Sequence, residues 1–162
     1  MSFKKILVAT DFSKESAVAL DTAIDFARAT GASIEVVHVV EEPIATVGGA
    51  HAYAFDVPEL RGELLKMAEQ ALTDIQKAHE GVPLATRALV GYAARTIVEM
   101  ATDEQVDLIV LGSHGRHALT RLLMGSVAER VVRLAPCAVL TVKARLSTEP
   151  ATVREAAAVV SS

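Results

Sequence analysis

Glycine and serine residues in the last third of the chain have the types and spacing of an anion-binding loop. Two residues separate Gly112 from Gly115, and Gly125-Ser126 follows after nine more. Glycine permits positive φ and lets backbone N–H groups approach a ligand without an intervening Cβ. Successive N–H groups in such a turn form a nest for an anion, and the unpaired N–H groups at a helix start favour a phosphate. The spacing therefore predicts a phosphate site.

A second candidate segment, Thr10-Asp11, directly follows the apolar run 6–9. That run predicts a buried strand, and the glycine loop follows a clearer run at 107–111. In open parallel sheets, ligands bind beyond the carboxyl ends of the strands, where the strand order reverses. Both segments are therefore expected at one edge of the sheet. Taken alone, a glycine after a strand is often only a turn, and Ser126 could simply cap its helix.

Strands and helices alternate along the chain. Apolar runs predict strands at 6–9, 33–40, 85–90, 107–111 and 138–142, with helical periodicity between them. Strict alternation indicates right-handed crossovers and a parallel sheet. Aromatic residues make up 4% of the chain, so the core must consist of Val, Ile, Leu and Ala, which is typical of a buried sheet with helices on both faces. Residues 41–57, which contain Pro43 and Gly48-Gly49, are predicted to form a long loop.

Composition and charge limit the classes of function. The 162 residues carry a net charge of −4, which lacks the basic character of a nucleic-acid-binding surface. Cys137 is the one cysteine, so no intrachain disulfide can form and the thiol is expected to be a small buried group. The first apolar run is too short for a signal peptide or a membrane span, so a cytoplasmic location and no membrane partner are expected. One domain is predicted over 1–143, with a tail at 144–162 that is flexible or forms a short helix.

The glycine loop differs from two familiar phosphate-binding motifs. No Gly-Lys-Ser/Thr follows the glycines, so it is not a Walker A loop, and it lacks the G-x-G spacing of the dinucleotide fingerprint. His114 and His117 lie in or beside the loop, where one could act as a base or simply occupy a loop position, since no acidic or nucleophilic partner is near in sequence. His38, on a predicted strand, is expected to be packed or hydrogen-bonded. The histidines are scattered and show no zinc-binding spacing.

The loop and its flanking strands resemble the nucleotide-binding branch of the universal stress protein family. The family's glycine motif matches Gly112-x2-Gly115-x9-Gly125-Ser126, and GSHGR at 112–116 and MGSVAERV at 124–131 are similar to it. The opening KILVATDFS at 5–13 and the later APCAVLTV at 135–142 look like the family's first and last strands. The resemblance runs from about residue 4 to residue 143. The branch of the family that does not bind ATP lacks these glycines.

The resemblance implies an α/β fold with a five-stranded parallel sheet in the order 3-2-1-4-5 and helices on both faces. Asp11 would bind the ribose or hold a magnesium ion on the phosphates, and backbone atoms near Ala9 and Val39 would contact the adenine. A homodimer would form by pairing of the last strand, 138–142, across a two-fold axis. The nucleotide-binding residues that the resemblance implies are Ala9, Thr10, Asp11, Val39, Leu111, Gly112, His114, Gly115, Arg116, Gly125, Ser126 and Val127.

Three functions fit this sequence. The first is a stress-response sensor or regulatory module that binds ATP, AMP or cyclic AMP and hydrolyses ATP slowly at most. The second is a slow ATPase or phosphotransferase. Fast phosphoryl transfer would need a lysine on the phosphates, metal ligands and a positioned nucleophile. Asp11 is the one obvious carboxylate candidate, and no catalytic residue is predicted. The third is a dimeric scaffold that works without a nucleotide. A receiver-type domain is excluded because Val90-Gly91 supplies no phosphoacceptor aspartate.

Overall fold

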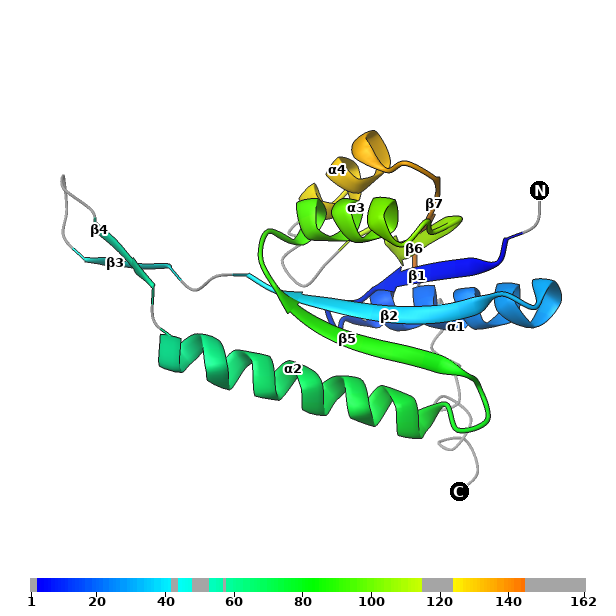
Figure 1. Ribbon diagram of the computed structural model, residues 1–162, viewed down its shortest axis with the longest axis horizontal. Helices are drawn as coiled ribbons and strands as arrows, with labels where there is room; N and C mark the ends of the chain where they lie inside the picture. Colours follow the sequence, from blue (N-terminus) through cyan, green and yellow to red (C-terminus); the bar gives the residue numbers. More distant parts are fainter. Residues whose placement is uncertain (1–2, 42–43, 48–52, 57, 115–123, 145–162) are drawn as a thin grey trace, which may run out of the picture.

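A parallel β-sheet of five strands forms the centre of the computed structural model, which describes residues 3–41, 44–47, 53–56, 58–114 and 124–144. The strands are β1 (Lys5–Ala9), β2 (Ser33–Val40), β5 (Leu84–Val90), β6 (Leu108–Gly112) and β7 (Ala138–Val142). Their order across the sheet is β5-β2-β1-β6-β7, and every neighbouring pair is parallel (Figure 1). Counted along the chain, this confirms the predicted order 3-2-1-4-5. The order reverses between β1 and β6, where a ligand site is expected.

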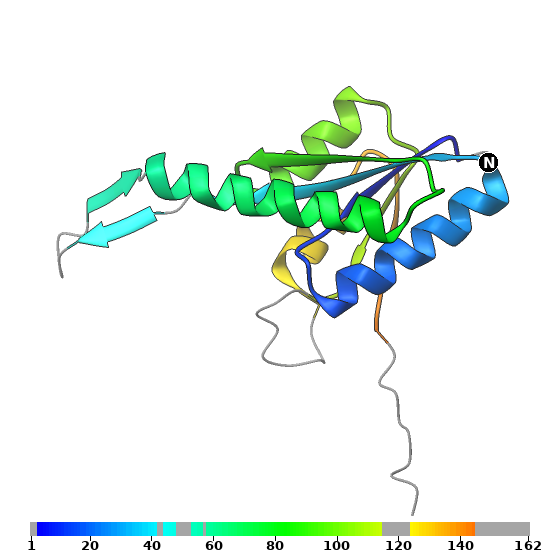
Figure 2. The ribbon, with the colours of Figure 1, turned by 90° about the horizontal axis from the view of Figure 1, so that it is seen from below.

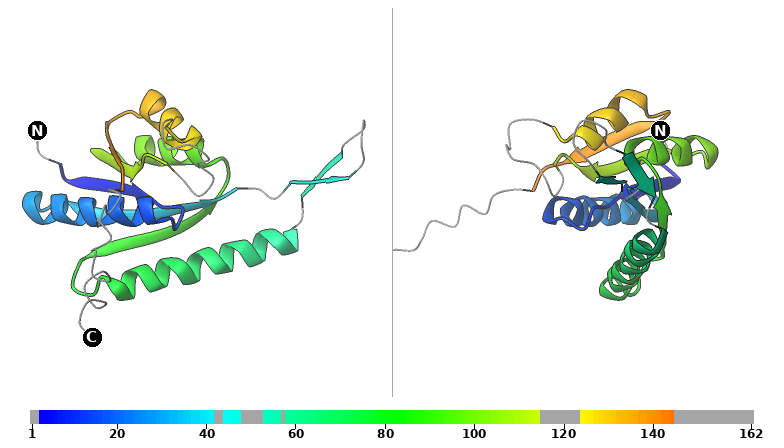
Figure 3. Two further views of the ribbon diagram at one scale, coloured as in Figure 1. Left: turned by 180° about the vertical axis from the view of Figure 1, so that it is seen from behind. Right: turned by 90° about the vertical axis from the view of Figure 1, so that its left-hand side faces the viewer.

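Helices cover both faces of the sheet, as predicted (Figures 1 and 3). α1 (Lys14–Thr30) and α2 (Pro58–Ala78) pack on one face, and α3 (Ala93–Asp103) and α4 (Ser126–Leu134) pack on the other. The alternation of side chains along each strand assigns them to the two faces. Ile6 and Val8 of β1 join the core beneath α1, whereas Leu7 joins the core beneath α3 and α4. The sheet is therefore buried on both faces.

Local sequence signals fix the helix starts that border the strand ends. The Ser13 hydroxyl accepts the Ser16 N–H as the N-cap of α1, and Gly31 ends that helix with φ 74°. α4 begins differently, with Gly125 as its N-cap and no side-chain cap. Ser126 is thus the first helical residue, so its hydroxyl does not cap the helix.

Residues 41–57 are not only a loop, which corrects the sequence-based prediction. They contain an antiparallel hairpin of β3 (Ile44–Val47) and β4 (Tyr53–Asp56), paired from Ile44↔Asp56 to Val47↔Tyr53. The hairpin extends away from the sheet, beyond the start of α2 (Figures 1 and 2, and the left view of Figure 3). Strands of four residues are too short for their periodicity to be separated from that of a loop.

An ion-pair network ties the amino-terminal part of the sheet to the end of α3. Arg87 Nη2 lies 2.7 Å from Glu35 Oε1, and Arg87 Nη1 lies 2.7 Å from Glu104 Oε1. Lys5 Nζ contacts Glu104 and lies 3.6 Å from Glu35. Glu35 is 7% exposed, so two cations offset the burial of its charge. The hydrogen bond from Lys5 lowers the pKa of Glu104, and the same bond raises the pKa of Lys5.

The chain beyond β7 is described only as far as Ala144. The predicted tail at 144–162 therefore lies almost wholly outside the described residues, and its separation from the domain stays a prediction. In the described part of the chain, no helix is both long and apolar enough to cross a membrane.

Candidate functional site

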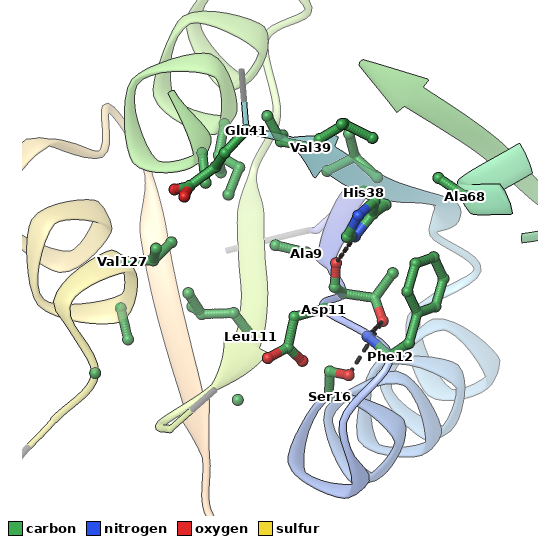
Figure 4. A pocket seen from close by; sticks show the side chains of 18 of the residues that line it. Ala9, Asp11, Phe12, Ser16, His38, Val39, Glu41, Ala68, Leu111 and Val127 are labelled. Atoms are coloured by element: carbon green, nitrogen blue, oxygen red, sulfur yellow. Dashed lines mark hydrogen bonds between the residues drawn. The ribbon is translucent and has the colours of Figure 1, made fainter. Parts of the chain in front are cut away.

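A cavity of about 820 Å³ opens at the carboxyl ends of β1, β2 and β6 (Figure 4). Its volume lies within the range of small-molecule sites. All of the sequence-predicted site residues that the structure describes line it, namely Ala9, Thr10, Asp11, Val39, Leu111, Gly112, His114, Gly125, Ser126 and Val127. Gly115 and Arg116 lie outside the described residues. The fold thus brings the two candidate segments, which are distant in sequence, to one cavity.

The first turn of α4 gives the cavity a set of unpaired hydrogen-bond donors. The Glu129 N–H donates to the Gly125 carbonyl at 2.9 Å, and this bond is the first of the helix. The N–H groups of Ser126, Val127 and Ala128 therefore have no acceptor within the helix, and all three residues line the cavity. The helix dipole places partial positive charge at the same point. This arrangement can hold an anion such as a phosphate.

Both described glycines of the loop have structural roles that the sequence analysis did not predict. Positive φ was expected to explain Gly112, and this is wrong: Gly112 ends β6 and is not among the positive-φ glycines of the described residues. A Cβ at Gly112 would come 3.1 Å from Glu15 Cβ and 3.1 Å from the His114 carbonyl oxygen, so the close approach of α1 and of this carbonyl leaves little room for a side chain. The Gly125 N–H donates to the Ser113 carbonyl at 2.9 Å, so this N–H is already paired, although Gly125 lines the cavity.

Asp11 directs a carboxylate into the cavity from the end of β1 (Figure 4). Its Oδ1 accepts the Ser13 N–H at 3.1 Å, which orients the side chain. Phe12 has φ 63°, a left-handed conformation that is rare for a bulky residue. This turn takes the chain out of the sheet directly after Asp11 and leaves the carboxylate at the strand end.

Asp11 could hold a ribose hydroxyl or a magnesium ion. Magnesium in nucleotide sites is commonly bound by one or two carboxylates together with substrate phosphates, so one carboxylate fits that chemistry. Among the described residues, no group of three or more His, Cys, Asp or Glu side chains could hold a metal ion by itself. The donor set therefore suits a metal that arrives with a phosphorylated ligand.

The main chain of Val39, at the end of β2, offers the cavity both a donor and an acceptor. Odd-numbered residues of β2 direct their N–H and C=O groups toward β1: the Ser33 N–H donates to the Lys4 carbonyl, and the Thr10 N–H donates to the Val37 carbonyl. Val39 is the next such residue, but the pairing with β1 has ended. Among the described residues, neither its N–H nor its C=O has a partner on the β1 side of β2.

Apolar side chains of α2 and α3 form much of the cavity wall, and the sequence analysis assigned none of them to the site. The residues are Leu64, Met67, Ala68 and Ala71 of α2 and Ala93 and Ile97 of α3. Met67 is 68% exposed, although the apolar periodicity of α2 predicts a core position for it. A stripe of apolar residues shows that a helix face is covered, but it cannot show whether a sheet or a cavity lies beneath it.

His114 lines the cavity in an unusual environment. Its Nδ1 lies 2.8 Å from Ser113 Oγ, and its Nε2 is buried without a hydrogen-bond partner in the described structure. The second loop histidine, His117, lies outside the described residues. The charged residues that line the cavity are Asp11 and Glu41, and no lysine or arginine of the described residues does so. A phosphate in the described part of the cavity could therefore be held by backbone N–H groups and by neutral side chains such as that of Ser126, but not by a lysine or arginine.

Comparison with known proteins agrees with this geometry. The model of the universal stress protein family matches residues 2–143. The universal stress protein MJ0531 of Methanocaldococcus jannaschii is 39% identical over 145 residues, which cover 87% of this chain and 82% of that protein. The solved structure of MJ0577, from the same organism, has a TM-score of 0.75 and 30% identity and covers 91% of this chain and 100% of its own.

A universal stress protein from Archaeoglobus fulgidus, solved in complex with dAMP, has a TM-score of 0.57 and 27% identity. The match covers 88% of this chain and 100% of that chain. The residues that the family model matches include the strands that border the cavity and the sequence of the glycine loop. The chain belongs to the universal stress protein family.

Proposed function

We propose that this protein binds an adenine nucleotide in the cavity and acts as a stress-response sensor or regulatory module that hydrolyses ATP slowly at most. One observation carries the proposal: the cavity joins N–H groups of the first turn of α4 with the N–H and C=O of Val39, and none of these groups has a partner within the described part of the chain. A phosphate suits the first set. The relative from Archaeoglobus fulgidus that was solved with dAMP supports the same ligand class.

The Val39 groups favour adenine over guanine. Adenine presents an amino donor beside a ring nitrogen acceptor, which complements a C=O and an N–H from one residue. Guanine presents an oxygen acceptor beside a ring N–H donor. In the same position, its oxygen would face the Val39 C=O and its ring N–H would face the Val39 N–H. A mismatched buried polar pair is expected to cost about 1–3 kcal/mol. Asp11 would bind the ribose or a magnesium ion on the phosphates, and Gly115 and Arg116 remain predicted members of the site.

We also propose that β7 forms a homodimer seam. Its inner edge pairs with β6 from Leu108↔Ala138 to Gly112↔Val142, and the Val142 carbonyl accepts the Ser113 N–H. By the alternation of a parallel ladder, the N–H and C=O groups of Val139 and Thr141 point away from β6. A free edge of this kind favours pairing with another strand. The cytoplasmic location stays a prediction from the sequence.

Isothermal titration of the purified protein with AMP, ADP, ATP, cyclic AMP and GMP tests the proposal. An adenine nucleotide should bind tighter than about 1 mM, and GMP should bind at least about tenfold more weakly than AMP. Binding of every nucleotide no tighter than about 1 mM would favour the scaffold function instead. Phosphate release from ATP at rates on the order of 1 per second, typical of working enzymes, would favour the ATPase or phosphotransferase.

A further inference from the structure

At the end of β2, the side chains of His38 and Thr10 bond to the two backbone groups that could otherwise pair with the Val39 main chain. If the pairing of β1 with β2 continued, the Val39 N–H would donate to the Thr10 carbonyl, and the Phe12 N–H would donate to the Val39 carbonyl. Neither bond is present in the described structure. Instead, the Thr10 carbonyl is 2.7 Å from His38 Nδ1, and the Phe12 N–H donates to Thr10 Oγ1 at 3.0 Å.

The His38 imidazole is held in the position that its hydrogen bond to the Thr10 carbonyl requires. A carbonyl oxygen can only accept, so His38 Nδ1 carries the proton of this hydrogen bond. The ring also lies against the Phe12 ring, with centroids 4.4 Å apart. Figure 4 shows the imidazole above the strand end, with its hydrogen bond directed at the backbone beside Ala9. His38 therefore gives the Thr10 carbonyl a hydrogen-bond partner, so that this carbonyl is satisfied without the Val39 N–H.

The Thr10 hydroxyl is held by the first turn of α1. Thr10 Oγ1 donates to Ser16 Oγ at 3.1 Å, and Ser16 Oγ donates to the Ser13 carbonyl at 2.9 Å. With its proton engaged, Thr10 Oγ1 has a lone pair for the Phe12 N–H. The Thr10 side chain is buried, so the arrangement is shielded from water and rigid.

We propose that His38 is a positioning residue that keeps the N–H and C=O of Val39 available to an adenine base. The inference rests on the proposed function. Without the Nδ1 donor, the Thr10 carbonyl would lack a partner at a buried strand end. Buried backbone carbonyls seldom remain unpaired, and the Val39 N–H is the donor in ladder register. The Val39 N–H would then donate to the Thr10 carbonyl, which adds one hydrogen bond to the sheet. It would no longer be available to the adenine base.

Amide hydrogen exchange of Val39, followed by NMR without ligand, tests this directly. His38→Phe retains a ring against Phe12 but loses the donor, whereas His38→Asn keeps an N–H donor at similar reach and serves as the matched control. The Val39 amide should exchange readily in the wild-type protein and in His38→Asn. It should exchange at least about tenfold more slowly in His38→Phe, because a new backbone hydrogen bond protects it. Equal exchange in wild type and His38→Phe would overturn the proposal.

Titration with AMP provides the second measurement. His38→Phe should bind AMP about five- to tenfold more weakly, the loss expected for about one hydrogen bond, and His38→Asn should bind within about twofold of wild type. Unchanged AMP affinity in His38→Phe would also overturn the proposal. If the wild-type protein bound no adenine nucleotide, the proposed function would fail, while the exchange experiment would still decide whether His38 holds the strand edge open.

Discussion

At the amino end of the sheet, charged groups of β1, β2 and β5 are paired with one another and with Glu104 at the end of α3. At the carboxyl end, backbone groups of Val39 and of the first turn of α4 have no hydrogen-bond partner among the described residues and lie beside a cavity. A buried polar group without a partner costs roughly 1–3 kcal/mol, so such groups can persist only where a ligand or water reaches them. One end of the sheet secures the fold, and the other stays available for binding. Substitutions at the two ends should therefore separate stability from nucleotide affinity.

The largest expected effect is on stability, from Arg87→Ala at the amino end. Arg87 bridges Glu35 and Glu104, with N–O distances of 2.7 Å to each, and its loss leaves Glu35 buried with the more distant Lys5 as its cation. We expect the free energy of unfolding to fall by about 2 to 3 kcal/mol, because an incompletely paired buried charge is strongly destabilising. Urea unfolding measures the change, and AMP affinity at a temperature where the variant is folded should match wild type.

Arg95→Ala is the matched control for Arg87→Ala. Arg95 pairs with Glu99 at 2.7 Å, but its side chain is 74% exposed, so its loss should change the free energy of unfolding far less than the loss of Arg87. If both alanine variants lost the same stability, the burial of Glu35 would not explain the effect of Arg87.

At the carboxyl end, Ser126→Pro should have the largest effect on binding. Proline suits the first position of a helix, and it requires an extended preceding residue, which Gly125 already is with φ −64° and ψ 148°. The substitution therefore removes the Ser126 N–H and hydroxyl while keeping α4. We expect AMP to bind about 2 kcal/mol more weakly, because the lost donor would face a charged phosphate.

Ser126→Ala separates the two donors of that residue. It removes the hydroxyl alone, so the expected loss is about 1 kcal/mol. Calorimetric titration of both variants decides between them: equal losses would mean that the backbone N–H does not contact the ligand. A loss near zero for Ser126→Ala would mean that its hydroxyl takes no part.

Asp11→Ala should weaken nucleotide binding by about 1.5 kcal/mol, because a carboxylate that accepts a hydrogen bond from a ribose hydroxyl is lost. Asp11→Asn is the control, since its side-chain oxygen can still accept the Ser13 N–H that Asp11 Oδ1 accepts at 3.1 Å. The fold should survive in both variants, as circular dichroism can show. Wild-type affinity in Asp11→Ala would remove this residue from the site.

The smallest expected effect is the pH dependence of the amino-end network. The hydrogen bond from Lys5 lowers the pKa of Glu104 below its ordinary value of 4.5. Glu104 should therefore stabilise the fold fully above about pH 4.5, and this contribution should disappear as the pH falls through the lower pKa of the folded state. In urea unfolding between pH 7 and pH 3, the difference between wild type and Glu104→Gln should narrow at the acid end. A difference that stays constant with pH would contradict the assignment.

The parallel sheet was predictable because the apolar runs and the helical periodicity between them both indicated alternating strands and helices. The apolar runs predicted every strand of the parallel sheet, with bounds within a residue of those observed. The hairpin of β3 and β4 was missed because its strands are short. The cavity wall of α2 was missed because an apolar stripe does not identify what it covers.

The sequence by itself determined which residue types follow the strands: a carboxylate at Asp11, glycines and a helix start near Ser126, and apolar runs long enough for a buried sheet. Only the tertiary structure decided which backbone groups remain free. Hydrogen-bond pairing depends on where neighbouring strands stop relative to one another, and that is a property of packed chains. It is why the Gly125 N–H reaches the Ser113 carbonyl, why Gly112 makes room for α1, and why His38 Nδ1 reaches the Thr10 carbonyl.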